Sequence, residues 1–214
     1  MPSPIISHQA PALFIKIKYP KKIDGTAICI GTLVPDLCEI IPLGIRAFTH
    51  SLLGLLLWTV PMTIPLTMLF CRYIGPIISN FAKKDMLFSK PLQFFGVDNW
   101  DLLKKKVFNK QFFIVAFYSA LIGGLTHLLF DLPAHSGITL FYPWIFSVPN
   151  FLLTTVVDFG TITIGIWQYD ASYKIYNVIW HIENVILFFI SLYLLRSIKK
   201  RDLISKWDTS LEKK

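Results

Sequence analysis

The sequence predicts an all-α, multi-pass membrane protein, and three observations support this fold class. Of its 214 residues, 54% are hydrophobic and 16% are charged, whereas soluble domains carry about 25% charged residues. The charged residues are clustered, and long stretches between the clusters contain none, which is the pattern that a bilayer requires. The mean hydropathy is +0.55, and three apolar segments are long enough to cross about 30 Å of hydrocarbon as helices.

The three candidate spans follow directly from the apolar runs. They are residues 48–73, 112–131 and 176–195. Pro61 and Pro65 interrupt the first span, and we expect them to kink it, because membrane helices tolerate prolines whose freed backbone groups find other partners.

Two shorter apolar stretches, residues 9–17 and 25–36, precede the first span. Each is too short to cross a bilayer alone, so we expect a partly inserted helical hairpin. Residues 138–165 are also apolar, but prolines and a glycine break them, and either a re-entrant segment or an interfacial cap is expected. The whole chain, 1–214, is predicted to be a single membrane domain.

The basic residues predict an orientation. Nineteen of the 21 Lys and Arg residues lie at the hairpin tip, at Arg72, in a Lys-rich loop at 80–110, or from Arg196 into a tail at 197–214. One topology puts all of these on one side, which the positive-inside rule makes the cytoplasmic side of a cell membrane. Because membrane orientation explains the net charge of +8, no nucleic-acid partner is expected.

The three cysteines predict no disulfide framework. Their number is odd, and Cys29, Cys38 and Cys71 all lie within or beside apolar stretches. We expect buried, unreactive thiols.

The same topology gathers the histidines at the non-cytoplasmic end, at the level of Asp36 and Asp131. The five histidines are His8, His50, His127, His135 and His181. Imidazole nitrogens and carboxylate oxygens suit zinc and similar metals, and ionisable groups in a span indicate function by default. We therefore predict a metal site at this end, with all seven residues as candidate ligands.

The most specific spacing within this set is a run of ligands four residues apart. His127, Asp131 and His135 fall on one face of a helix, with a drift of about 40° per step. Pro133 is expected to end or kink this helix, so His135 is predicted to reach back from a turn.

Other residues at this end are candidates for supporting roles. Arg46 and Lys174 are the two cations on the outer side, where they could hold a phosphate group or serve as interfacial anchors. Thr49, Ser51 and Thr126 flank predicted ligands and could hydrogen-bond to them. Ordinary helix-facing hydroxyls are the alternative.

Five blocks in an ordered series carry a family resemblance. They are PSPIISHQAPAL, IGTLVPDL, FTHSLLGLLL, GGLTHLLFDLPAH and YKIYNVIW. With them the chain resembles the prokaryotic membrane family filed as domain of unknown function 4184, over residues 1–195 apart from the Lys-rich loop and the outer segment. That family is similar to predicted membrane-bound metal-dependent hydrolases and, more distantly, to zinc-dependent phospholipases C and their nuclease relatives.

The resemblance implies a zinc-phospholipase-C-like helical core that holds two or three divalent ions, with zinc expected. It also implies that metal-activated water hydrolyses a phosphate ester, with Asp36 or Asp131 as catalytic groups that bridge the metals or orient the water. The zinc phospholipase pattern ends in His-x-x-x-Glu. Here His181 is followed by Glu183, and Val185 occupies the fourth position, which favours two ions over three.

We therefore expect a membrane-bound hydrolase that acts on phosphate esters such as phospholipid headgroups at the outer face, with membrane lipid as partner. The alternative is a non-enzymatic membrane protein whose His/Asp site holds a structural or transported metal. Transport is disfavoured because the spans are almost wholly apolar below the histidines. A scaffold with ordinary interfacial polar residues would explain the spans but not the convergence of histidines.

Overall fold

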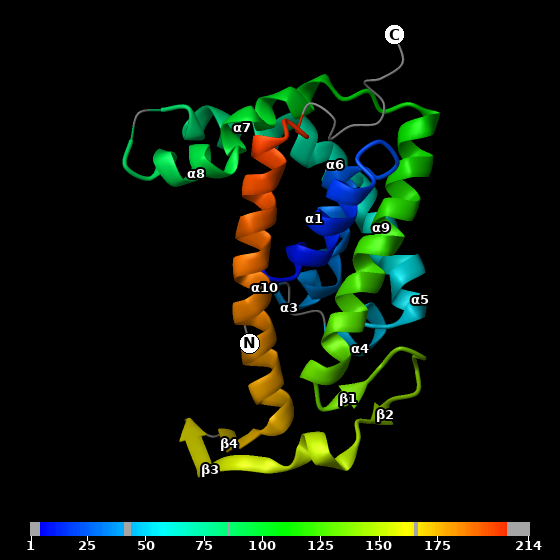
Figure 1. Ribbon diagram of the computed structural model, residues 1–214. Coiled ribbons are helices and arrows are strands. Elements are labelled where there is room, and N and C mark those ends of the chain that lie inside the picture. Colours follow the sequence, from blue (N-terminus) through cyan, green and yellow to red (C-terminus); the bar gives the residue numbers. More distant parts are fainter. Residues whose placement is uncertain (1–4, 41–43, 85, 165–166, 205–214) are drawn as a thin grey trace.

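The computed structural model describes residues 5–40, 44–84, 86–164 and 167–204, and these residues are mostly helical. Three helical runs are long and apolar enough to cross a membrane (Figure 1). They are Leu52–Ala82, Lys110–Ala134 and Ile175–Lys200. The predicted helical architecture with three helices of membrane-spanning length is confirmed.

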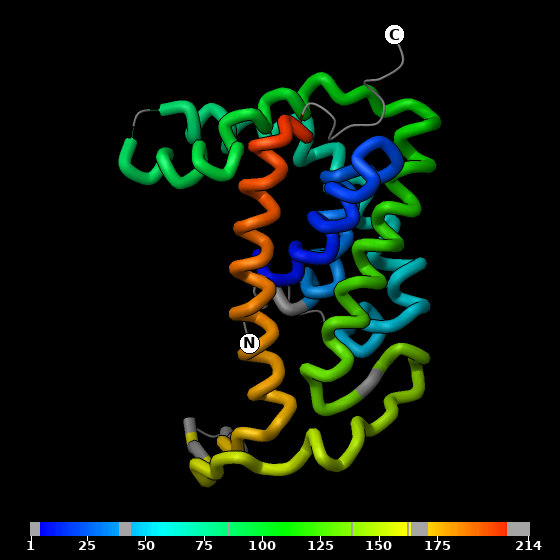
Figure 2. The backbone as a smooth tube through the Cα atoms, viewed as in Figure 1, coloured from blue at the N-terminus to red at the C-terminus, as the bar shows by residue number. Residues whose placement is uncertain are grey.

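The predicted N-terminal hairpin is a pair of short helices followed by two further turns. They are α1 (Gln9–Lys18), α2 (Gly25–Gly31), the 3-10 turn η1 (Val34–Asp36) and α3 (Leu37–Ile40). The side chain of Asp24 caps α2 by accepting a hydrogen bond from the Ala27 amide at 2.8 Å. Because α1 packs against α10 and α2 against α9, the hairpin lies between these long helices (Figure 2).

The first long helix is a run of five segments, preceded by the short helix α4 (Arg46–Thr49). They are α5 (Leu52–Gly54), η2 (Leu55–Thr59), α6 (Val60–Leu69), η3 (Phe70–Ile74) and α7 (Gly75–Ala82), of which η2 and η3 are π-helical. The run begins later than predicted because Ser51 caps it, accepting a hydrogen bond from the Gly54 amide at 2.9 Å. The π-helical η2 ends two residues before Pro61, and widened turns of this kind are where helices bend.

The other two long helices are α9 (Lys110–Asp131), which continues into the 3-10 turn η5 (Leu132–Ala134), and α10 (Ile175–Lys200). Asn109 caps α9 by accepting a hydrogen bond from the Phe112 amide at 2.9 Å. Only 11% of the most apolar stretch of α10 is buried inside the protein, as expected for a helix that faces lipid.

Glycines allow α2 and α9 to approach each other closely. A Cβ atom on Gly31 would lie 2.8 Å from the carbonyl oxygen of Ala120, and one on Gly123 would lie 2.3 Å from that of Ile28. Both separations are too short for a real Cβ atom. Lipid tails are as apolar as helix surfaces, so close packing of small residues is a main source of helix association in membranes. The contact joins the C-terminal half of α2 to the middle of α9, and the chain runs on from both sides of it to the predicted ligands.

Two lysines are buried at the basic end of the bundle. Lys106 forms an ion pair with Asp24, and the two side chains are 0% and 1% exposed. Lys16 donates hydrogen bonds to the carbonyl oxygens of Pro20 and Ile23 at 2.6 Å and 2.7 Å. Removing one partner of a buried charge pair costs about 3–5 kcal/mol, so the Lys106–Asp24 pair fixes the hairpin tip against the segment that precedes α9. The Lys16 hydrogen bonds close the hairpin tip on itself.

The predicted Lys-rich loop at 80–110 is largely helical. After α7 come α8 (Ser89–Phe95) and the 3-10 helix η4 (Val97–Lys105). Both α7 and α8 project sideways from the bundle near the C-terminal end of α10, and η4 packs against α7 (Figure 1). Of the predicted basic tail, residues 205–214 lie outside the described part of the chain.

The outer segment corrects the all-α expectation, because it contains two small antiparallel sheets. In them β1 (Gly137–Ile138) pairs with β2 (Phe146–Ser147), and β3 (Thr155–Ile164) pairs with β4 (Trp167–Lys174), with η6 (Asn150–Leu153) between the sheets. The β-branched residues of TVVDFGTITI favour a pleated conformation, and Gly160 takes φ 74°, which other residues rarely adopt. The segment lies across the ends of α9 and α10 and does not re-enter the bundle (Figure 1).

We expect Gly123→Val to lower the free energy of unfolding by about 1–3 kcal/mol, because the added methyl groups must push α2 away from α9. Thermal unfolding of the purified protein in detergent, followed by tryptophan fluorescence, measures this as a lower Tm. The matched control is Leu125→Val, on the exposed face of the same helix, where Leu125 is 40% exposed. Equal Tm values for wild type and Gly123→Val would contradict the packing.

Candidate metal centre

Four of the predicted ligands meet at one end of the long helices. Asp36 ends η1, His50 follows α4, and His127 and Asp131 lie on the last two turns of α9. Each offers one ligand atom, and these atoms all lie within 4.8 Å of one another. The four residues are between 1% and 9% exposed, so the cluster is enclosed by protein.

The separations between these atoms fit a tetrahedral ion. Zinc with bonds of about 2.0–2.1 Å places neighbouring ligand atoms about 3.3 Å apart. His50 Nε2 lies 3.1 Å from Asp36 Oδ1 and 3.5 Å from Asp131 Oδ2. His127 Nε2 lies 3.4 Å from Asp36 Oδ1, 3.3 Å from Asp131 Oδ2 and 3.4 Å from His50 Nε2. Five edges of a tetrahedron are therefore close to the expected length, and the cluster could hold a metal ion.

A buried carboxylate oxygen supports the same interpretation. Asp131 Oδ2 is buried and has no hydrogen bond to any described residue, although imidazole nitrogens lie around it at 3.3–3.5 Å. Leaving a buried charged oxygen without a hydrogen bond is costly, and a cation supplies the missing partner. The donor set of two imidazoles and two carboxylates is one that zinc accepts.

The backbone of α4 orients the ring of His50. His50 Nδ1 lies 3.1 Å from the Arg46 carbonyl oxygen and 3.1 Å from Thr49 Oγ1. When Nδ1 carries the proton and donates it to this carbonyl, Nε2 is unprotonated and faces the carboxylates. The tight turn after His50 requires glycine at position 54, because a Cβ atom on Gly54 would lie 1.9 Å from the Phe48 carbonyl oxygen.

Of the three hydroxyl residues predicted near the ligands, Thr49 is the one with a contact to a ligand. Ser51 caps α5 and donates to the Phe48 carbonyl oxygen at 2.6 Å. Thr126 donates to the Gly123 carbonyl oxygen at 2.7 Å, within its own helix. The described contacts of Ser51 and Thr126 are therefore those of helix structure.

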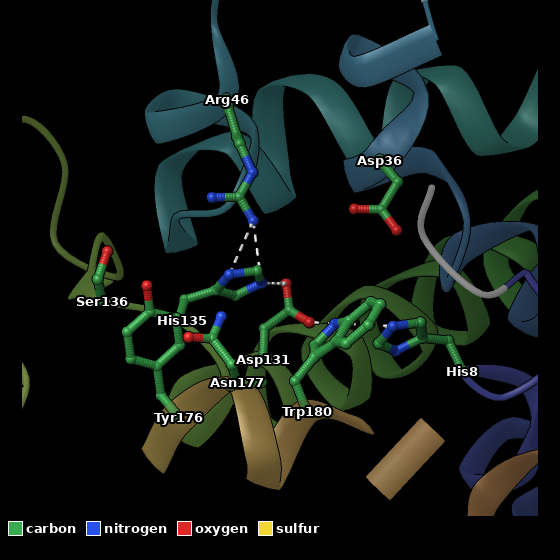
Figure 3. Close-up of a pocket in the computed structure, with 10 residues that line it drawn as sticks. His8, Asp36, Arg46, Asp131, His135, Ser136, Tyr176, Asn177 and Trp180 are labelled. Atoms are coloured by element: carbon green, nitrogen blue, oxygen red, sulfur yellow. Dashed lines mark hydrogen bonds and ion pairs between the residues drawn. The ribbon is translucent and has the colours of Figure 1, made fainter. Parts of the chain in front are cut away.

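His8 and His135 lie on opposite sides of Asp131 (Figure 3). His135 Nε2 is 3.3 Å from Asp131 Oδ2, and His8 Nε2 is 4.0 Å from Asp131 Oδ1. Burial lowers the pKa of His8, which favours the neutral imidazole that metals bind. The two oxygens of Asp131 thus face different histidines.

His181 and Lys174 lie apart from the cluster. His181 is exposed, and its Nδ1 is 2.6 Å from the Tyr173 hydroxyl and 2.8 Å from the Asn177 carbonyl oxygen. Lys174 ends β4, and its backbone amide donates to the Asn177 side chain at 2.9 Å. Sequence reasoning grouped both residues with the cluster by their depth in the membrane. Depth in the membrane does not specify which face of α10 a residue occupies, and that face decides which contacts His181 makes.

A cavity of about 360 Å³ opens beside the cluster (Figure 3). Asp36 and Asp131 line it from the cluster, and Arg46 lines it from α4, where its Nη2 lies 3.0 Å from His135 Nε2. The first turns of α10 supply the opposite wall with Tyr176, Asn177 and Trp180. The sequence analysis did not predict these three residues, because it considered charged residues and histidines as site candidates. The feature that could have identified them is the YKIYNVIW block at the start of α10.

A family model described as Domain of unknown function (DUF4184) matches residues 1–212. The chain belongs to this family. The predicted resemblance to this family is confirmed, and the matched range contains all four residues of the cluster described above. No curated protein and no solved structure matched the chain. The family description names no reaction, so function is argued from the site itself.

We expect purified wild-type protein to carry divalent metal at near-stoichiometric levels, measured by inductively coupled plasma mass spectrometry. His127→Ala and Asp131→Ala should each lose this metal, because each removes a ligand atom from the buried cluster. His181→Ala is the matched control and should retain it, since His181 bonds to Tyr173 instead. Wild-type protein without zinc, manganese or iron would contradict the metal centre.

Proposed function

We propose that this protein is a membrane-bound, metal-dependent hydrolase of phosphate esters, phospholipid headgroups among them. The observation that carries the proposal is a buried His/Asp cluster in the wall of a cavity that also presents Arg46. A guanidinium beside a cation site is suited to an anionic phosphoryl group, which both can contact. The likeness to zinc-dependent phospholipases C that the sequence blocks led us to expect points to the same reaction class.

Different residues of the chain would serve different roles in this reaction. Asp36, His50, His127 and Asp131 would hold one ion, and Asp131 with His8 would hold a second, with zinc as the expected metal. Bound divalent metal supplies Lewis acidity and lowers the pKa of a coordinated water. The carboxylates of Asp36 and Asp131 orient the attacking water, and Arg46 orients the phosphoryl oxygens.

The position of the cavity supports a lipid substrate. It lies where α9 ends and α10 begins, which is headgroup depth for helices that span a bilayer. Aromatic side chains on the outer segment are exposed at the same end, as in the aromatic belts of membrane proteins. They are Trp144 at 68%, Phe146 at 51%, Phe151 at 62% and Phe159 at 69% exposure. Membrane lipid is therefore the proposed partner.

We propose, from the positive-inside rule, that this site faces the non-cytoplasmic side. In a background without native cysteines, Ser136→Cys should react with a membrane-impermeant thiol reagent on intact cells. Lys105→Cys, in the exposed part of η4, should react only after lysis. Reaction of both positions from the same side would contradict the topology.

We expect Arg46→Ala to raise KM for phosphodiesters by roughly 10- to 100-fold with unchanged metal content, because a charge-assisted contact to substrate is lost. Arg46→Lys should recover part of the loss, and Lys174→Ala is the matched control without effect. Turnover is measured with a chromogenic phosphodiester and with phospholipid vesicles. Metal-loaded wild-type protein that hydrolyses no phosphate ester would overturn the proposal.

A transported metal is the second candidate, and one observation favours it. Thr59, Thr63 and Thr67 are fully buried and four residues apart on the first long helix, so they place a row of hydroxyls inside an otherwise apolar span. Zinc uptake into proteoliposomes separates the two functions. Uptake that Thr63→Val abolishes would favour transport, whereas ester hydrolysis without uptake would favour the enzyme.

A further inference from the structure

Residues 75–84 and 86–95 form a helical arm at the basic end of the protein, opposite the metal cluster. It consists of α7 and α8, which project sideways from the bundle (Figure 1). One face of α7 carries the small residues Gly75, Ser79 and Ala82, which are buried, and the helix packs against η4. The arm is therefore packed against the rest of the protein through the contact of α7 with η4.

The exposed surface of the arm carries several large apolar side chains. Ile77 and Phe81, one turn apart on α7, are 66% and 40% exposed. Leu87 and Phe88 at the tip are 78% and 73% exposed, and Phe94 on α8 is 51% exposed. Scattered apolar side chains are normal on protein surfaces, but a group of this size on one short arm marks a binding surface.

Lysines flank the apolar tip. Lys84 and Lys90 are exposed on either side of it, and Lys104 and Lys105 are exposed on the neighbouring η4. Lys83 binds Asp101, with Nζ 2.8 Å from Oδ2, so this acidic side chain is already engaged by a cation. In sequence the segment between Lys84 and Lys90 is DMLFS, with three apolar residues and one acidic residue, Asp85. Apolar residues beside an excess of lysines are typical of segments that lie in the interface of an anionic membrane.

Contacts with α10 hold the arm at a fixed angle to the bundle. Arg196 donates to the Phe94 carbonyl oxygen at 2.8 Å and lies 4.1 Å from the centre of that ring. Lys199 donates to the Gln93 carbonyl oxygen and lies 3.6 Å from Asp98 Oδ1. Because α10 has membrane-spanning length, an arm that leaves its end sideways runs along the bilayer surface.

We propose that the arm is a docking surface for the anionic lipids of the leaflet at the basic end. Leu87 and Phe88 enter the boundary of the acyl chains, and Lys84 and Lys90 contact the headgroup phosphates. Continuity with the spanning helices, the apolar tip and the charge complementarity of the lysines all point to this one partner. The docking surface is remote from the metal cluster, so this proposal does not depend on the proposed hydrolase function.

Spin labels test the depth of the tip. In a cysteine-free background, labels at Leu87→Cys and at the control Lys105→Cys are compared in nanodiscs of phosphatidylcholine with phosphatidylglycerol. At position 87, collisions with oxygen should exceed those with a water-soluble nickel complex, and position 105 should show the reverse. Equal nickel access at both positions would overturn the proposal. A label shielded from both reagents would indicate a protein partner and would overturn it too.

Hydrogen–deuterium exchange tests the lipid charge on the unlabelled protein. Amides of residues 86–95 should exchange several-fold more slowly in discs that contain phosphatidylglycerol than in discs of phosphatidylcholine alone. The double variant Lys84→Gln, Lys90→Gln should remove the difference, and Lys22→Gln at the hairpin tip should keep it. Equal exchange of the wild type in both lipids would overturn the preference for anionic lipid.

Discussion

The backbones of α2 and α9 touch where the carbonyl of Ile28 meets Gly123, and the geometry of the metal cluster depends on this contact. Asp36 follows α2 by five residues, and His127 follows Gly123 by one turn, so the contact sets the separation between a carboxylate and an imidazole. The turn before α5 then adds His50, whose ring is oriented by a backbone carbonyl. A side chain at position 123 would separate the ligands without changing any of them.

The same helix pair is fixed at its other end by charge. Asp24 caps the start of α2 and pairs with Lys106, which lies just before α9. A buried ion pair gives little net stability, but its geometry is exacting and it strongly disfavours any register that leaves one charge alone. Close packing in the middle and a specific ion pair at one end therefore present the ligands at the other end to the cavity. As a result, the candidate metal ligands lie at one surface of the bundle and the basic residues lie at the opposite one.

Sequence alone predicted the features that depend on depth in the membrane, and it missed those that depend on contact. The three long helices and the shared level of His8, His50, His127 and His135 follow from apolar length. The position of His181 outside the cluster does not follow from apolar length, because the contacts of His181 depend on which face of α10 meets the bundle. Strands β3 and β4 were not predicted, because their apolar residues fit a membrane cap equally well. The helical arm was not predicted, because its lysines indicated a loop. Burial of Lys106 had no signal, since a loop lysine and a buried one look alike in sequence.

X-ray absorption spectroscopy at the zinc edge of the zinc-loaded wild-type protein tests whether Asp36, His50, His127 and Asp131 bind one metal ion. We expect a first shell of nitrogen and oxygen at about 2.0 Å, with the outer-shell scattering of at least two imidazoles and no sulfur. A sulfur shell at about 2.3 Å, as Cys38 beside Thr49 would supply, or a spectrum without imidazole scattering, would contradict this expectation.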